Sequence, residues 1–111
     1  MKKPTSTEYR GDRIGLKVTV DGQPLDPQPS QKLRNHSPDG FNWGYGGSGP
    51  AQLALGILLD FYGSGLELTY YQDFKWKVIA CLPQNGSWII TGAEIESHMG
   101  DIFKERGAGH A

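Results

Sequence analysis

The segment Ala51–Tyr62 constrains the fold most, because it is apolar at almost every position. Pro50 stands directly before it, and proline is favoured at the first position of a helix. The positions that are polar or lack a side chain recur every four residues and are Gln52, Gly56 and Asp60. At helical spacing they form one narrow stripe on an otherwise apolar cylinder. Such a helix belongs in the middle of a fold, so we predict a central buried helix over residues 50–62.

The sequence before this helix predicts β structure over residues 9–25. In the run GLKVTV apolar and polar residues alternate, as in a strand with one buried face. The dipeptide Asp21-Gly22 follows, and Asp-Gly signals a tight hairpin because both turn positions need positive φ. Residues 23–25 would then form a short return strand.

Residues 26–40 contain several prolines and show no usable hydrophobic period. We therefore predict a surface connector there, with Leu33 as its one apolar anchor. The two ends of the chain, residues 1–8 and 106–111, are expected to be disordered.

Two further helices are predicted after the central one. The first of them ends before Pro83, and its start is left open between two capping boxes, Ser64 with Glu67 and Thr69 with Gln72. Its buried stripe would consist of Tyr71, Phe74, Val78 and Leu82. At 100° per residue, Trp76 points to nearly the opposite side.

The run SWII, residues 87–90, is either a short strand or an extended link. A third capping box, Thr91 with Glu94, opens the last helix. The order of elements predicts an α+β fold, in which a small N-terminal β-hairpin or sheet packs on about three helices. Residues 1–111 would form a single domain, since domains typically have roughly 100–150 residues.

Composition excludes several classes of function. The net charge is −1, from 11 basic and 12 acidic residues, so no overall field favours nucleic acid or anionic lipid. Cys81 is the only cysteine, which excludes an internal disulfide, and we interpret it as a small core residue. The first residues lack the apolar segment of a signal peptide, and the longest apolar run is shorter than the ~20 residues of a membrane span. We expect a soluble, cytoplasmic protein without a membrane partner.

The run GYGGSGP, Gly44–Pro50, leads into the central helix and is the strongest candidate site. Unpaired N–H groups at a helix start favour an anion, and glycines let the main chain approach a ligand closely. Aromatic residues beside the loop could stack on a flat ring, and the polar stripe would extend the groove. The predicted ligand-binding residues are Trp43, Tyr45, Gly46, Gly47, Ser48, Gly49, Gln52 and Asp60. Alternatively, the loop is only a capped turn whose aromatic residues pack on the core.

Named motifs fit this run poorly. The spacing Gly44-x-Gly46-x-x-Gly49 matches the dinucleotide fingerprint, but that motif needs a strand before it and a second strand after its helix. The phosphate-binding loop and the nucleophile elbow both fail where Pro50 stands. The three histidines lack ligand-like spacing, so we expect no metal site and no cofactor.

Trp76 is the candidate interaction residue, because it points away from the stripe that its helix buries. Together with Lys75 and Lys77 it could form a small basic and aromatic patch for single-stranded nucleic acid. The near-neutral charge makes a solvated helix face the better interpretation.

Three segments of the chain resemble an uncharacterised bacterial family, a domain of unknown function. They are GFNWGYGGSGPAQLALGILLD, YQDFKWKVIACLP and WIITGAEI, with a weaker YRG near Tyr9. Members of the family look like small proteins of bacterial genomes, plasmids and phages. The resemblance implies a bacterial or phage accessory protein, one that could modulate host defence, and it implies no activity or catalytic residue.

The sequence therefore supports three hypotheses of function. The first is a non-enzymatic protein that binds a small anionic, nucleotide-like ligand at the glycine loop. The second is a protein-interaction module that uses Trp76 and the loop aromatics against a host or phage protein or a second copy of the chain. The third is a small hydrolase or transferase that uses Ser48 with His36 or Asp60.

Overall fold

The computed structural model describes residues 2–63 and 67–108 of the 111-residue chain. The elements that position the candidate sites are strands, α-helices and two short 3₁₀ helices. In chain order they are β1 (Glu8–Asp12), η1 (Ile14–Leu16), β2 (Lys17–Val20), β3 (Gln23–Pro24), α1 (Gln28–Leu33), α2 (Ser48–Tyr62), α3 (Glu67–Lys77), η2 (Ile79–Cys81), β4 (Trp88–Thr91) and α4 (Gly92–Ala108).

The strands form one antiparallel sheet in the order β3-β2-β1-β4. The predicted hairpin joins β2 to β3, and its turn residues Asp21 and Gly22 have φ values of 49° and 83°. The hairpin prediction is therefore confirmed. The SWII run, which the sequence left open, is a strand that pairs with β1, so that Tyr9 lies between Val20 and Ile90.

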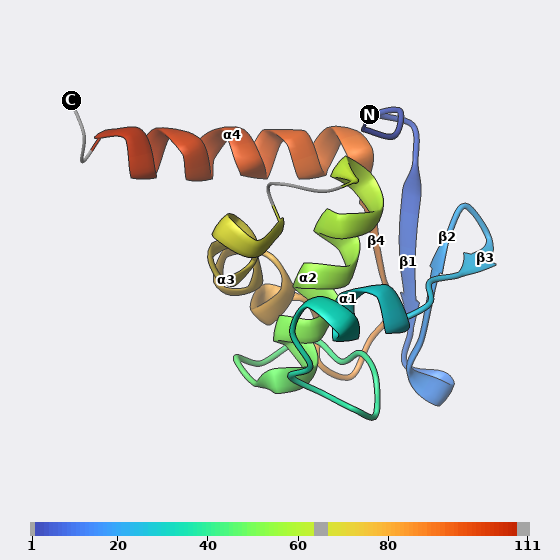
Figure 1. Cartoon of the computed structure of the whole chain (residues 1–111). Helices are drawn as coiled ribbons and strands as arrows, with labels where there is room; N and C mark the ends of the chain where they lie inside the picture. Colours follow the sequence, from blue (N-terminus) through green and yellow to red (C-terminus); the bar gives the residue numbers. More distant parts are fainter. Residues whose placement is uncertain (1, 64–66, 109–111) are drawn as a thin grey trace.

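The helices lie to one side of the sheet, with α2 running along it and α4 crossing its end (Figure 1). Every residue of α2 from Gly49 to Leu58 is buried. This confirms the central buried helix, which begins two residues before the predicted start at Pro50. The fold is α+β, as the order of elements predicts.

The helix α3 is shorter than predicted, because the chain tightens into η2 after Lys77 instead of continuing to Leu82. Of the predicted stripe, Tyr71, Phe74 and Val78 are buried. Of the two proposed start signals, Thr69 lies inside α3 and cannot cap it, and Ser64 lies outside the described residues.

The capping box at α4 is present as predicted. The Thr91 N–H donates to Glu94 Oε1 at 3.0 Å, and the Glu94 N–H donates to Thr91 Oγ1 at 3.2 Å. The helix runs to Ala108, so residues 106–108 are helical where the sequence predicts disorder. No helix in the described ranges is long and apolar enough to cross a bilayer.

Residues 2–8 also differ from the expectation of disorder. The Lys3 N–H donates to the Phe61 carbonyl at the end of α2, at 2.8 Å. The Gly92 N–H donates to the Thr7 carbonyl at 2.8 Å, and the Thr7 residue is buried. These backbone bonds attach the segment before β1 to both α2 and α4.

The connector over residues 26–40 contains α1, which its prolines conceal in the sequence. Proline is tolerated in the first turn of a helix, and Pro29 occupies the second position of α1. Leu33 is 39% exposed, so it is not the anchor that the sequence suggests, whereas Ser30 is buried.

Candidate functional site

The glycine loop, residues 44–49, turns sharply before it enters α2. Gly44 has a φ of 84°, and its N–H donates to the Ile79 carbonyl at 3.0 Å. A Cβ on Gly44 would lie 2.4 Å from the Gln84 backbone, so this position requires glycine for both conformation and space. The loop is thereby fixed to the segment that follows α3.

Aromatic side chains cover the next glycines. A Cβ on Gly46 would lie 2.3 Å from the ring of Trp76, and one on Gly47 would lie 2.3 Å from the ring of Tyr45. These glycines therefore permit close contact with the protein's own aromatic rings. The sequence predicts that they would permit the close approach of a ligand. The loop presents aromatic rings as well as backbone to its surroundings.

Trp43 does not form the predicted stacking shelf. Its side chain is fully buried, and its indole N–H donates to the Gly86 carbonyl at 3.2 Å. Its ring packs edge-on against Trp88 at a centroid distance of 5.6 Å. Trp43 is a core residue.

Gln52 holds the connector, and it is not available to a ligand. Its side chain is fully buried, and its Oε1 accepts the N–H groups of His36 and Ser37 at 2.8 and 3.0 Å. Its Nε2 donates to Ser30 Oγ at 2.9 Å and to the Arg34 carbonyl at 3.1 Å. One amide thus satisfies polar groups on both sides of the end of α1.

Asp60 lies at the other end of the same polar stripe, and its carboxylate also binds other residues of the protein. It accepts a hydrogen bond from the Tyr9 hydroxyl at 2.6 Å and forms an ion pair with Lys3 at 2.9 Å. Burial raises the pKa of Tyr9 above its ordinary value of 10.0, and the hydrogen bond to Asp60 raises it further. Asp60 and Gly56 line a small hollow of about 220 Å³, from which Gln52 is separate.

The residues of the enzymatic hypothesis do not come together. Ser48 is exposed at the start of α2, whereas His36 Nε2 lies 2.7 Å from the Tyr71 hydroxyl and Asp60 is engaged as above. Cys81 is exposed, with its Sγ 3.6 Å from the Trp76 carbonyl, which corrects its interpretation as a core residue. Within residues 2–63 and 67–108, no three His, Cys, Asp or Glu side chains lie close enough together to hold a metal ion.

Trp76 lies on the face of α3 that the sequence predicts. Its side chain is 59% exposed, and Lys75 Nζ lies 4.1 Å from the centre of its ring. Tyr45 is 40% exposed, and both rings cover neighbouring glycines of one loop. We call Tyr45 and Trp76 the aromatic surface; Lys75, which lies against the Trp76 ring, is itself buried. The dinucleotide interpretation of the loop fails here, because α3 stands where the second strand would be.

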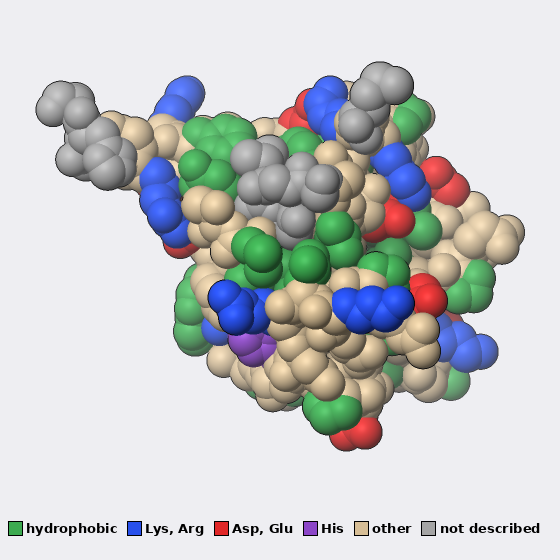
Figure 2. All heavy atoms as spheres, viewed as in Figure 1, with side chains coloured by type: hydrophobic (Ala, Val, Ile, Leu, Met, Phe, Trp, Pro, Cys, Tyr) green, Lys and Arg blue, Asp and Glu red, His purple; other side chains and the backbone are tan. Residues whose placement is uncertain are grey.

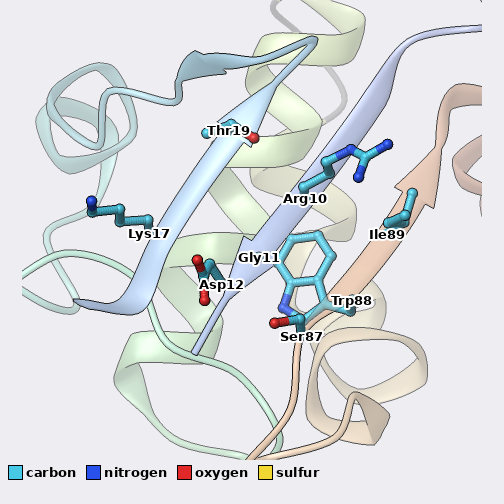
Figure 3. A pocket seen from close by; sticks show the side chains of 8 residues that line it. All are labelled: Arg10, Gly11, Asp12, Lys17, Thr19, Ser87, Trp88 and Ile89. Atoms are coloured by element: carbon cyan, nitrogen blue, oxygen red, sulfur yellow. The ribbon is translucent and has the colours of Figure 1, made fainter. Parts of the chain in front are cut away.

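A larger hollow, of about 620 Å³, lies on the sheet, and the sequence reasoning did not anticipate it. Figure 3 shows its lining residues on β1, β2 and β4, with Ser87 directly before β4. The signal that could have found it is the alternation of β1, which places Arg10 and Asp12 on one face. Elsewhere, Figure 2 shows Lys and Arg scattered over the viewed face among Asp and Glu.

The chain belongs to a family of unknown function, DUF6166, whose family model matches residues 9–101. No curated protein sequence and no solved structure gives a significant match to the chain. The match covers the sheet, α2, α3 and the first part of α4, and therefore includes the glycine loop, the aromatic surface and the hollow.

Proposed function

We propose that this chain is a small, non-enzymatic accessory protein that binds a partner protein through the aromatic surface. The observation that carries the proposal is the placement of Trp76, which rests on Gly46 and is still 59% exposed. Tryptophan and tyrosine are the residues that most often contribute large shares of binding energy at protein interfaces. An exposed tryptophan and an exposed tyrosine on one loop therefore form the centre of the proposed interface.

The ring of Trp76 is also held before a partner arrives. It contacts Gly46 on the loop, and Lys75 Nζ lies over it at 4.1 Å. Immobilising a free side chain on binding costs roughly 0.5–1.5 kcal/mol, so a ring that is already held lowers the cost of association. Lys75 is itself only 7% exposed, so it supports the ring and is not a contact for the partner.

The resemblance to bacterial and phage proteins supports a partner from the host or the phage, met in the cytoplasm. A partner that functions in host defence would fit this context. A second copy of the chain is the alternative occupant of the surface.

The test is retention of partner proteins from a bacterial lysate by the immobilised chain and its variants. Trp76→Ala and Tyr45→Ala should each abolish retention of the specific partner. Ile14→Ala is the matched control, because Ile14 is 83% exposed on η1 and should be dispensable. Sedimentation of the free protein would show whether the partner is a second copy.

The control for folding is the thermal unfolding of each variant. Because Trp76 is 59% exposed, its loss should cost no more than about 2 kcal/mol of stability. The proposal is wrong if both aromatic variants remain folded and still retain the same proteins as the wild-type chain.

A small anionic ligand at the glycine loop is the second candidate. The observation that favours it is that the first turn of α2 has no side-chain cap, with Ser48 exposed beside it. Tyr45 and Gly46–Gly49 would form this site, without Trp43, Gln52 and Asp60. Nucleotides or sugar phosphates at a hundredfold over Kd would stabilise the fold by about 2.7 kcal/mol, which thermal-shift screening would detect. No shift with any of them would exclude it.

A further inference from the structure

The sheet has two edge strands, β3 and β4, and they differ in what they present to solvent. An edge strand directs the N–H and C=O groups of alternate residues away from the sheet, where a strand of another chain can pair with them. Directly after β3, the Leu25 N–H donates to the Val18 carbonyl of β2 at 2.9 Å, so the backbone of the preceding residue, Pro24, faces outward. Proline has no N–H to offer, and the edge of β3 is therefore closed to an added strand.

The direction of the backbone groups in β4 follows from its pairing with β1. The Gly92 N–H, directly after β4, donates to the Thr7 carbonyl at 2.8 Å and continues the register of the two strands. Hydrogen-bonded and non-hydrogen-bonded pairs alternate along an antiparallel ladder, so Trp88 and Ile90 direct their backbone groups at β1. The N–H and C=O groups of Ile89 therefore point away from β1, at the free edge of the sheet.

This edge of β4 is accessible at Ile89. In the described part of the chain, no other group forms a hydrogen bond with the N–H or the carbonyl of Ile89. The side chain is apolar and 49% exposed, whereas edge strands are commonly protected by charged residues or by proline. Ser87 lies two residues earlier, on the same edge, and is also exposed. Residues 87–89 thus form a short open stretch of strand edge.

Glu94 closes one end of this stretch. The backbone of Thr91 also faces away from β1, but its N–H donates to Glu94 Oε1 at 3.0 Å. This bond occupies the next outward donor, and it places the Glu94 carboxylate on the side of the free edge. An added strand can therefore pair over residues 87–89 and has to end before Thr91.

The helix α4 limits what can lie beside β4. It starts directly after β4 and runs away from β2 and β3, on the side of the free edge (Figure 1). In an antiparallel pair of two β4 edges the twofold axis is perpendicular to the sheet, so a second copy would bring its helices to the same face and against α4. A single extended segment needs only one strand spacing, about 4.8 Å, and fits beside β4.

The face of α4 beside this place is acidic. Asp101 follows Glu94 after about two helical turns, so both exposed carboxylates lie on one face. This stretch of α4 is about 10 Å long and therefore spans the place of an added strand. Lys77 pairs with Glu105 at 2.6 Å, whereas neither Glu94 nor Asp101 has an ion pair in the described ranges. A basic side chain on the added strand would meet these carboxylates.

We propose that the edge of β4 binds an extended, basic segment of a partner protein, which adds one more strand to the sheet. The backbone of the segment would pair with Ser87 and Ile89, and main-chain hydrogen bonds of this kind supply affinity in strand addition. An apolar side chain would lie beside Ile89, and the basic side chains would face α4. This site uses none of the residues of the aromatic surface, so it is independent of the proposed function.

The test is a titration with a synthetic peptide of alternating valine and lysine, followed by ¹H–¹⁵N NMR of the backbone. A peptide of alternating valine and glutamate is the control, because it has the same strand pattern and the opposite charge. We expect the lysine peptide to bind saturably, to shift the signals of Ser87 and Ile89, and to slow hydrogen exchange of the Ile89 N–H about tenfold or more. The glutamate peptide should bind at least about tenfold more weakly.

Two variants close the edge in different ways. Ile89→Lys adds the kind of charge that protects natural edges, and Ile89→Pro removes the outward N–H without removing a bond to β1. Each should weaken binding of the lysine peptide about tenfold or more. Ile14→Lys is the matched control, because Ile14 is 83% exposed on η1, away from this edge, and its affinity should stay within about twofold of the wild type.

The proposal is overturned if the lysine peptide does not bind, or if it binds without slowing exchange at Ile89. It is also overturned if Ile89→Lys, whose site is exposed and should not affect folding, binds the peptide as well as Ile14→Lys does. Equal affinity for the two peptides would overturn the assignment of a basic segment. A dimer of the free protein in sedimentation that Ile89→Lys disrupts would overturn the proposal and assign the edge to a second copy.

Discussion

Two irregular segments approach the central helix α2, and they are held in opposite ways. The connector that contains α1 is held by polar bonds, four of them to the buried amide of Gln52 and one from His36 to the Tyr71 hydroxyl. The glycine loop is held by aromatic rings, since Trp76 and Tyr45 lie directly on Gly46 and Gly47. The first arrangement is closed to solvent, whereas the second leaves both rings accessible.

The difference shows that a polar residue on a buried helix can bind other parts of the protein and need not bind a ligand. Gln52 interrupts the apolar sequence of α2. In the sequence analysis, the polar stripe to which it belongs suggests a groove for a ligand. Because a buried amide must be satisfied, the protein instead places four of its own polar groups around it. The rings of Tyr45 and Trp76 that cover the loop remain 40% and 59% exposed, so they are the better candidates for contact with another molecule.

Replacing the buried amide should have the largest effect. Gln52→Leu leaves the N–H groups of His36 and Ser37 and the Arg34 carbonyl without their partner. These bonds are only partly buried, and each is worth about 0.5–1.5 kcal/mol, so we expect a loss of about 2–4 kcal/mol in the free energy of unfolding, measured by urea denaturation. Gln72→Leu, on the exposed side of α3, is the matched control and should change stability by less than about 0.5 kcal/mol. Equal midpoints for the two variants would show that the amide does not hold the connector.

Asp60, at the other end of α2, makes the stability of the protein depend on pH through its hydrogen bond with Tyr9. Burial and the hydrogen bond to Asp60 raise the pKa of Tyr9 above its ordinary 10.0. Below pH 10 the Tyr9 phenol is protonated in both the folded and the unfolded chain, and Tyr9 contributes its full share to the free energy of unfolding. Above pH 10 the unfolded chain loses the proton first, so stability falls by up to about 1.4 kcal/mol per pH unit.

Tyr9→Phe should remove that part of the alkaline loss. Urea denaturation at pH 9, 10 and 11 would measure it, with Tyr62 contributing equally to both proteins because its raised pKa is unaffected by the substitution. If the wild-type chain and Tyr9→Phe lose the same stability between pH 10 and 11, the bond between Tyr9 and Asp60 is not part of the folded state.

Changing the glycine under the exposed ring should have the smallest effect on stability. Gly46→Ala places a Cβ where the ring of Trp76 now lies, 2.3 Å from its atoms, and the mostly exposed ring can move away. We expect a stability loss below about 1 kcal/mol. Partner binding should weaken roughly two- to tenfold, because the displaced ring must be immobilised again at each association. Affinity measured on a partner recovered with the wild-type chain would test this, and unchanged affinity would show that the ring need not be held.

Local patterns were sufficient for much of the fold. The Asp21-Gly22 turn, the buried helix over residues 50–62 and the Thr91–Glu94 capping box all depend on neighbours within a few residues, and all three are present. The pairing of β1 with β4 could not be derived in the same way, because its two strands are far apart in the sequence. The structural role of Gln52 could not be predicted from the sequence either, because it depends on which segment of the chain packs over α2.

The candidate site was predicted only where exposure follows from helix geometry. The position of Trp76 on the outer side of α3 followed from the spacing of the apolar residues, and the structure agrees. The glycines were predicted to let a ligand approach closely, whereas the groups that lie against Gly46 and Gly47 are the protein's own rings. The hollow on the sheet was missed because its lining residues come from three strands, and only the assembled register brings them together.

The middle position of β1 has a consequence for synthesis of the chain on the ribosome. Its partner β2 emerges within a few residues, but β4 follows only after α2 and α3 have left the exit tunnel. Until then the nascent chain exposes both the unpaired edge of β1 and the apolar surface of α2. Unpaired strand edges and exposed apolar surface both promote aggregation. We expect the growing polypeptide to depend on chaperone protection over that interval, and to become independent of it once residues 88–91 have docked.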